Sequence, residues 1–159
     1  MSADALIDAL ITSCVVVTSK DTEPRGCLVG SVMPVGYDAA AVAFALTTGS
    51  RTERAVVRSG AAVLHVLAAH DLATARRFAT DVNRFAGIAW TFGMLGAPVL
   101  QSVEGFLELA ITASFPAGVH TIFYGEVRHA AGSPSRILTM TEIRAAGVEP
   151  ARTSTGGSV

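Results

Sequence analysis

The short segment Ser50-Arg51-Thr52 is the first part of the chain whose residue types and spacing could do chemistry. It offers two hydroxyls, a guanidinium and, at a helix start, free backbone N–H groups, which together favour a phosphate. A structural interpretation fits equally well, because Ser50 and Glu53 have the spacing of a capping box and Arg51 is then a solvated charge. The residue pattern alone leaves both interpretations open.

A second candidate is His120, which begins a strand-like segment directly after a glycine turn. Its imidazole could donate a hydrogen bond or help to supply a proton. A single histidine at a strand end is more often structural. The other histidines, His65, His70 and His129, show no ligand spacing with Cys, Asp or Glu, so we expect no metal site. The G-x-G-x-x-G fingerprint and the phosphate loop ending in Gly-Lys-Ser/Thr are both absent.

Short strand-like and helix-like segments follow one another along the chain and must position these residues. Apolar runs predict strands beginning near Cys14 and spanning 27–33, 41–48, 63–67, 106–115 and 119–129, the last two forming an antiparallel hairpin. Capping and breaking residues predict helices over 2–10, 50–60, 71–80 and 139–147. Six or seven strands without regular βαβ alternation favour a closed antiparallel barrel.

The length and composition indicate one domain with a large apolar interior. A chain of 159 residues is one domain's worth, and we predict that residues 1–150 form it, with the small polar residues 151–159 as a disordered tail. Half of the residues are hydrophobic and 16% are charged. No run approaches the roughly 18 apolar residues of a membrane span, so the composition favours a buried sheet in an oligomer over a membrane protein.

Charge and cysteine content exclude several classes of function. The formal net charge of -1 gives no general attraction to nucleic acid. The first residues lack a basic segment followed by an apolar signal core, so a cytoplasmic protein is expected. Cys14 and Cys27 have no CxxC spacing and lie in apolar surroundings, which predicts buried free thiols.

Two separated segments carry a resemblance to a known family, namely 83–90 (NRFAGIAW) and 117–127 (AGVHTIFYGEV). With Arg25-Gly26, Ser31, Ser50-Arg51-Thr52 and the 96–100 segment (GAPVL) in matching order, they resemble the flavin reductase-like family over most of the chain up to Val127. The resemblance implies an FMN-binding split β-barrel, mainly β with short helices and usually a homodimer. It also implies FMN or FAD as the flavin and NADH or NADPH as the hydride donor.

The resemblance also assigns roles to particular residues. Phosphate binding is implied for Ser50, Arg51, Thr52 and Arg84, whereas Phe85 and Trp90 could flank the flavin ring. His120 corresponds to the family's histidine near the nicotinamide, which makes it the catalytic candidate. The segment that follows the ribityl chain and ring edge is Val29-Gly30-Ser31, and Leu46 completes the cofactor-binding set.

The chain departs from the family pattern at several of these positions. Leu28 stands where Thr is usual, Gly30 where Ser or Asn is usual, and Val119 where Asp is usual, while residues 38–40 replace a Pro-Pro pair. Backbone N–H groups remain at Val29 to Ser31, and glycine can bring its backbone close to a ligand. The leading hypothesis is an NAD(P)H-dependent flavin reductase whose product feeds a separate monooxygenase. The alternatives are a non-catalytic barrel that binds flavin, haem or another planar ligand, and an interaction dimer with a vacant groove.

Overall fold

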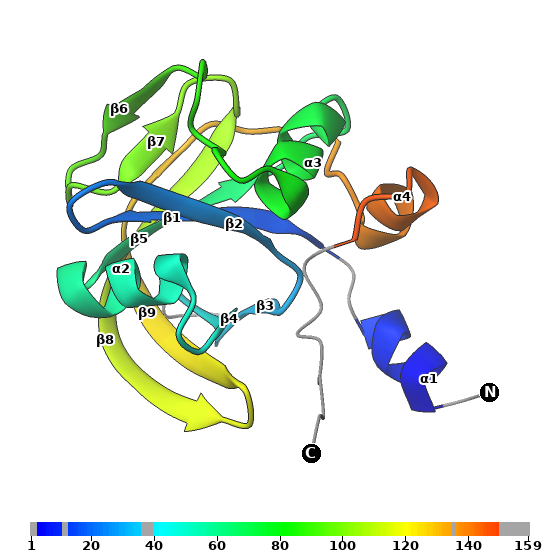
Figure 1. Ribbon diagram of the computed structural model, residues 1–159, viewed down its shortest axis with the longest axis horizontal. Helices are drawn as coiled ribbons and strands as arrows, with labels where there is room; N and C mark the ends of the chain where they lie inside the picture. The colour runs from blue at the N-terminus through cyan, green and yellow to red at the C-terminus, as the bar shows by residue number, and fades with distance from the viewer. Residues whose placement is uncertain (1–2, 11–12, 36–39, 135, 150–159) are drawn as a thin grey trace.

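The structure, a computed structural model, describes residues 3–10, 13–35, 40–134 and 136–149, and its main feature is one curled antiparallel sheet (Figure 1). The strand order is β2-β1-β5-β8-β9-β4-β3, and β6 and β7 pair separately. The strands are β1 (Val15–Lys20), β2 (Pro24–Val29), β3 (Val32–Pro34), β4 (Ala41–Thr47), β5 (Ala61–Val66), β6 (Trp90–Phe92), β7 (Pro98–Leu100), β8 (Gly105–Ala117) and β9 (His120–Ala131).

The helices are short and most begin and end where local signals predict. They are α1 (Ala3–Leu10), α2 (Arg51–Ser59), α3 (Leu72–Thr80) and α4 (Met140–Ala145). The Ser50 side chain accepts a hydrogen bond from the backbone N–H of Glu53 at the start of α2, and Gly60 ends that helix with a left-handed φ of 67°. The predicted cap of α1, Ser2, lies outside the described residues. In Figure 1, α1 stands away from the rest of the molecule.

The sheet is split between β2 and β3, which are its two edge strands. A single strand over 27–33 was predicted, and this is wrong: β2 ends at Val29 and β3 begins at Val32 on the opposite edge. The chain turns between them, where the Val32 N–H donates to the Gly30 carbonyl at 3.1 Å. The sheet therefore curls round until this turn joins its two edges, between which the described residues form no hydrogen-bonded ladder, and the predicted split β-barrel is confirmed.

Two apolar clusters lie on opposite faces of β1 and β2. Inside the curl, Phe44 of β4 stacks on Phe123 of β9 with ring centroids 5.4 Å apart. On the outer face, Leu28 of β2 packs with Phe78 of α3 and Met140 of α4. Full burial of an aromatic side chain such as these contributes about 2 to 3 kcal/mol. β2 is therefore held between the barrel on one side and two helices on the other.

Several expectations about the whole chain bear on function. Cys14 and Cys27 are both free thiols, as predicted, but only Cys14 is buried, and the prediction of a buried thiol is wrong for the partly buried Cys27. No described helix is long and apolar enough to cross a membrane. Among the described residues no group of three or more His, Cys, Asp or Glu side chains could hold a metal ion. The predicted tail, 151–159, lies outside the described residues.

Candidate active site

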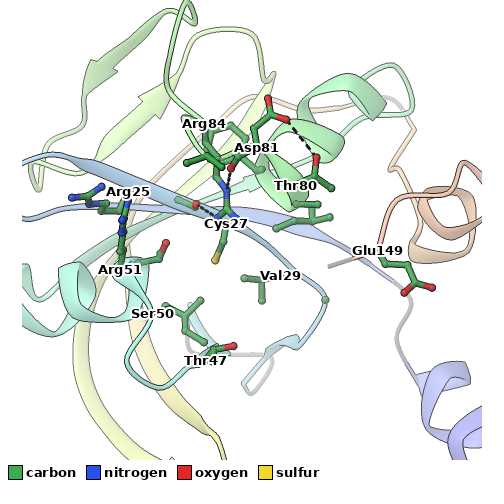
Figure 2. A pocket seen from close by; sticks show the side chains of 18 of the residues that line it. Arg25, Cys27, Val29, Thr47, Ser50, Arg51, Thr80, Asp81, Arg84 and Glu149 are labelled. Carbon is green, nitrogen blue, oxygen red and sulfur yellow. Dashed lines mark hydrogen bonds between the residues drawn. The ribbon is translucent and has the colours of Figure 1, made fainter. Parts of the chain in front are cut away.

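A groove of about 1080 Å³ runs along the edge strand β2 (Figure 2). One wall comes from β4 and the start of α2, and the other comes from the end of α3, the 81–85 loop and α4. All ten residues predicted for the site line this groove: His120, Val29, Gly30, Ser31, Leu46, Ser50, Arg51, Thr52, Arg84 and Phe85. The fold thus brings five separate segments to one cavity, whereas the role of each residue in binding or catalysis stays a prediction.

The start of α2 presents uncommitted donors to the groove. The Ser50 oxygen accepts from the Glu53 N–H at 3.2 Å, which leaves the Ser50 hydroxyl proton able to donate. The Arg51 guanidinium is exposed and makes no hydrogen bond or ion pair with any described residue. The backbone N–H groups of Arg51 and Thr52, at the first positions of the helix, also lack an acceptor among the described residues. This arrangement is suited to an anion.

Arg84, the second basic residue predicted for phosphate, is already tied to the backbone. Its Nη1 donates to the Gly26 carbonyl at 2.7 Å, and its Nε donates to the Asp81 carbonyl at 3.0 Å. The first contact links the 81–85 loop to the outer edge of β2. Two of the five N–H donors of the guanidinium are therefore used for structure, although Arg84 is also one of the residues that line the groove.

The outer edge of β2 offers backbone groups as well. The Gly26 carbonyl points away from β1, because Arg84 reaches it from the groove side. In an antiparallel ladder the outward-pointing residues alternate, so Leu28 also turns its backbone N–H and C=O toward the groove. The Leu28 side chain is 5% exposed and packs in the outer apolar cluster. Compared with the Thr that the family resemblance leads one to expect, Leu28 offers no side-chain donor. Its backbone still offers one donor and one acceptor.

The two aromatic residues predicted to flank a ring have different positions. Phe85 lines the groove and meets Phe78 edge-on, with centroids 5.3 Å apart. Trp90 is not part of the lining. It packs edge-on against Phe85 at 6.3 Å and against Phe92 at 5.0 Å. Trp90 therefore supports Phe85, and the expectation that it borders the same space is not met.

His120 is the first residue of β9 and lies between two neighbouring strands. It pairs with Thr47 of β4 and with Ala117 of β8, so its backbone position is fixed on both sides. The side chain is half-buried and lines the groove. No described residue forms a hydrogen bond or ion pair with its imidazole. The ring is thus free to meet a ligand.

The groove is also lined by residues that the sequence did not predict for the site. The Cys27 sulfur points into it in Figure 2, and burial raises the pKa of this thiol, with a hydrogen bond to Thr52 acting in the opposite direction. Strand alternation from Val29 could have identified Cys27. Arg144 and Glu149 line the far wall, and no local signal could have found them, because only long-range packing brings the chain after residue 139 back to β2.

Comparisons with known proteins agree with this fold. Residues 8–145 match the family described as flavin reductase like domain. HsaB, the reductase subunit of a flavin-dependent monooxygenase from Rhodococcus jostii, is 31% identical over 114 residues, which are 71% of this chain and 58% of that protein. The chain thus spans less than two thirds of that relative's length.

Two further proteins are similar over a larger share of their own length. The FMN reductase (NADH) SmoA of Agrobacterium fabrum is 30% identical over 126 residues, covering 79% of this chain and 72% of that protein. The solved structure of the NADH:FAD oxidoreductase SgcE6 from Streptomyces globisporus has a TM-score of 0.72 and 26% identity, covering 87% of this chain and 84% of that one.

Proposed function

This chain belongs to the flavin reductase-like domain family, and from that premise we propose that it is an NAD(P)H-dependent flavin reductase acting on FMN or FAD. Its reduced flavin is released to a separate monooxygenase, because the HsaB relative is the reductase subunit of a flavin-dependent monooxygenase. The observation that supports the proposal is the common groove, because all ten residues chosen from sequence, which come from separate segments of the chain, are among those that line it.

The groove residues fit the three parts of a flavin nucleotide. The uncommitted Arg51 guanidinium and the N–H groups at the start of α2 bind the phosphate. The backbone of Leu28 and of the Val29 to Ser31 segment meets the polar edge of the ring and the ribityl chain. When bound, the flavin supplies a ring that the nicotinamide reduces at N5.

The remaining residues of this chain orient the reactants. Phe85, held by Phe78 and Trp90, presents an apolar wall that excludes water from one side of the cavity. His120 donates a hydrogen bond to the nicotinamide and keeps it over the ring. Cys27, whose raised pKa keeps it a neutral thiol, packs against the ligand and takes no part in proton transfer.

We also propose that the protein is a homodimer in the cytoplasm. A cytoplasmic location would give it access to the soluble nicotinamide nucleotide. The distal part of the β8–β9 hairpin carries exposed Phe115 and Val119, at 54% and 52% exposure. Beyond Ile111, β8 pairs with β9 on one side and forms an edge of the sheet on the other, so packing against a second copy would cover this edge and its exposed apolar side chains. Light scattering on size-exclusion fractions tests this: a Phe115→Asp variant is expected to shift the mass toward the monomer, and an unchanged dimer mass would rule out this surface.

An anaerobic absorbance experiment tests the reductase. Purified protein is mixed with FMN or FAD, and NADH and NADPH are added separately, with heat-inactivated protein as the control. Protein-dependent bleaching of the flavin is the expected result, and it also gives the nicotinamide preference. Saturable flavin binding without bleaching would favour the non-catalytic barrel, and the absence of both would overturn the proposal.

A further inference from the structure

Glu53 does not form the capping box that its sequence spacing predicts. The Ser50 hydroxyl caps the Glu53 N–H, but the Ser50 N–H donates to the Thr47 carbonyl at 3.1 Å and not to the Glu53 carboxylate. The carboxylate makes two other contacts. Its Oε2 accepts from the Gly49 N–H at 3.3 Å, and its Oε1 accepts from the Thr121 hydroxyl at 3.3 Å. Glu53 therefore connects α2 to β9, a strand distant in sequence.

The helix α4 shows what a capping glutamate does when its role is local. There the Thr139 side chain accepts from the Glu142 N–H, and the Glu142 carboxylate accepts from the Thr139 N–H at 2.9 Å, which closes the box. Glu53 has the same spacing from its N-cap residue but uses its two oxygens elsewhere. Helix capping therefore does not explain the position of the Glu53 carboxylate.

The contact with Thr121 reaches the strand at the residue next to His120. Successive side chains of a strand point to opposite faces, so Thr121 points away from the groove while His120 points into it. The Thr121 hydroxyl also lies 2.9 Å from the Thr48 hydroxyl, and the Thr48 N–H donates to the Val119 carbonyl at 3.0 Å. The turn before α2 and the start of β9 thus share one hydrogen-bonded network, with the Glu53 carboxylate joining the helix to it.

We propose that Glu53 is a positioning residue that fixes the distance between the phosphate-binding start of α2 and His120. A flavin anchored at Arg51 by its phosphate then presents its ring to His120 in one geometry. This inference rests on the proposed function, because it concerns the same groove. Small misplacements matter here, since a displacement of about 1 Å can lower a rate by about 100-fold.

The test compares FMN with riboflavin, which has the same ring but no phosphate. In the wild-type protein we expect a higher kcat with FMN than with riboflavin. Glu53→Ala is expected to lower the FMN:riboflavin ratio of kcat by about tenfold, because the phosphate anchor no longer sets the ring position. Thr121→Val, which keeps the side-chain shape, is expected to lower the ratio in the same direction. Glu53→Gln retains one acceptor oxygen and is expected to give a smaller fall.

Glu126→Gln is the matched control. The Glu126 carboxylate belongs to β9, the strand that Glu53 contacts, but it pairs with Arg128 of the same strand at 2.8 Å and joins no second element in that contact. The FMN:riboflavin ratio of kcat in Glu126→Gln is expected to equal that of the wild type. A second readout needs no turnover: the ring resonances of His120 in NMR, assigned with a His120→Gln variant, are expected to shift differently with FMN and with riboflavin in the wild type. In Glu53→Ala this difference is expected to disappear.

The outcomes separate the inference from the proposed function. Equal losses of kcat with both flavins in Glu53→Ala would make Glu53 merely structural, and so would an unchanged ratio in Thr121→Val. If Glu53→Ala does not fold, the Thr121→Val and Glu53→Gln ratios decide. Absence of turnover in the wild type with either flavin would overturn the reductase, and the His120 resonances would then decide the positioning role alone.

Discussion

Replacing Arg51 with alanine gives the sharpest test of the phosphate site. Arg51 lies at the first position of α2, lines the groove and has no partner among the described residues. Its removal therefore breaks no hydrogen bond or ion pair among the described residues. We expect Arg51→Ala to weaken FMN binding and to leave riboflavin binding within about twofold, because only FMN carries the charge that the guanidinium meets.

The magnitude follows from the exposure of this side chain. Two unit charges about 4 Å apart interact by about 4 kcal/mol near a protein surface and by about 1 kcal/mol in bulk water. Arg51 is exposed, so the lower part of this range applies, and we expect a loss of about 1 to 2 kcal/mol. This is about a 5- to 30-fold rise in the Kd for FMN. Because the Debye length is about 8 Å at physiological ionic strength, the difference is expected to shrink as salt is added.

Titration of protein into FMN or riboflavin, followed by flavin fluorescence, measures both affinities. Arg58→Ala is the control, since it removes the same charge from the same helix. Arg58 lies outside the groove lining, with its side chain 66% exposed and 3.8 Å from Asp21. Equal losses for FMN and riboflavin in Arg51→Ala, or the same loss for FMN in Arg58→Ala, would refute the assignment of Arg51 to phosphate.

Four further predictions follow from the contacts described above. Arg84→Ala is expected to weaken FMN and riboflavin alike in the same titration, because its two backbone hydrogen bonds hold the groove wall; a loss confined to FMN would contradict this. His120→Ala is expected to lower kcat with little change in flavin Kd, whereas an unchanged kcat would make it structural. Burial lowers the pKa of His65 to about 4, below its unfolded value of 6.5, so the stability it contributes is complete above pH 6.5 and lost as the pH falls toward 4. Urea unfolding measures the free energy of unfolding between pH 6.5 and 4, and its fall should be smaller in His65→Gln than in the wild type, by up to about 3 kcal/mol. The same fall in both proteins would refute this prediction. Gly93→Ala would place a Cβ in the space that the buried Glu108 carboxylate occupies, so the free energy of unfolding in urea is expected to fall by about 1 to 3 kcal/mol. A smaller loss would show that the carboxylate can move aside.

Short-range signals predicted much of this protein from sequence. The Ser50 cap and the Gly60 stop define α2, and the Thr139 box defines α4, because each depends on hydrogen bonds or dihedral angles within a few residues. The long apolar runs predicted the β8–β9 hairpin for the same reason. The family motifs selected ten residues from five segments, and all ten line one groove.

Contacts between distant segments were not encoded in any local pattern. The chain breaks between β2 and β3 because the two strands lie on opposite edges of the sheet, which long-range pairing decides. The apolar run through 27–33 carries no sign of this break and therefore predicted a single strand. Arg84 looked like a free cation, yet the carbonyl that it binds belongs to a strand 58 residues earlier. Trp90 belongs to the NRFAGIAW motif but packs against Phe85 and does not line the groove. No spacing in the sequence indicates this position.

The sequence by itself determined the family, the helix ends and the residues that could meet a flavin, since side-chain chemistry and local backbone preferences are properties of short segments. Only the tertiary structure decided which of those residues are uncommitted. It leaves Arg51 without a polar partner among the described residues while tying Arg84 to the backbone, and it turns Glu53 from an expected capping residue into a link with β9. The physical reason is that each polar group has few hydrogen-bonding sites, and packing between distant segments decides which of them are occupied.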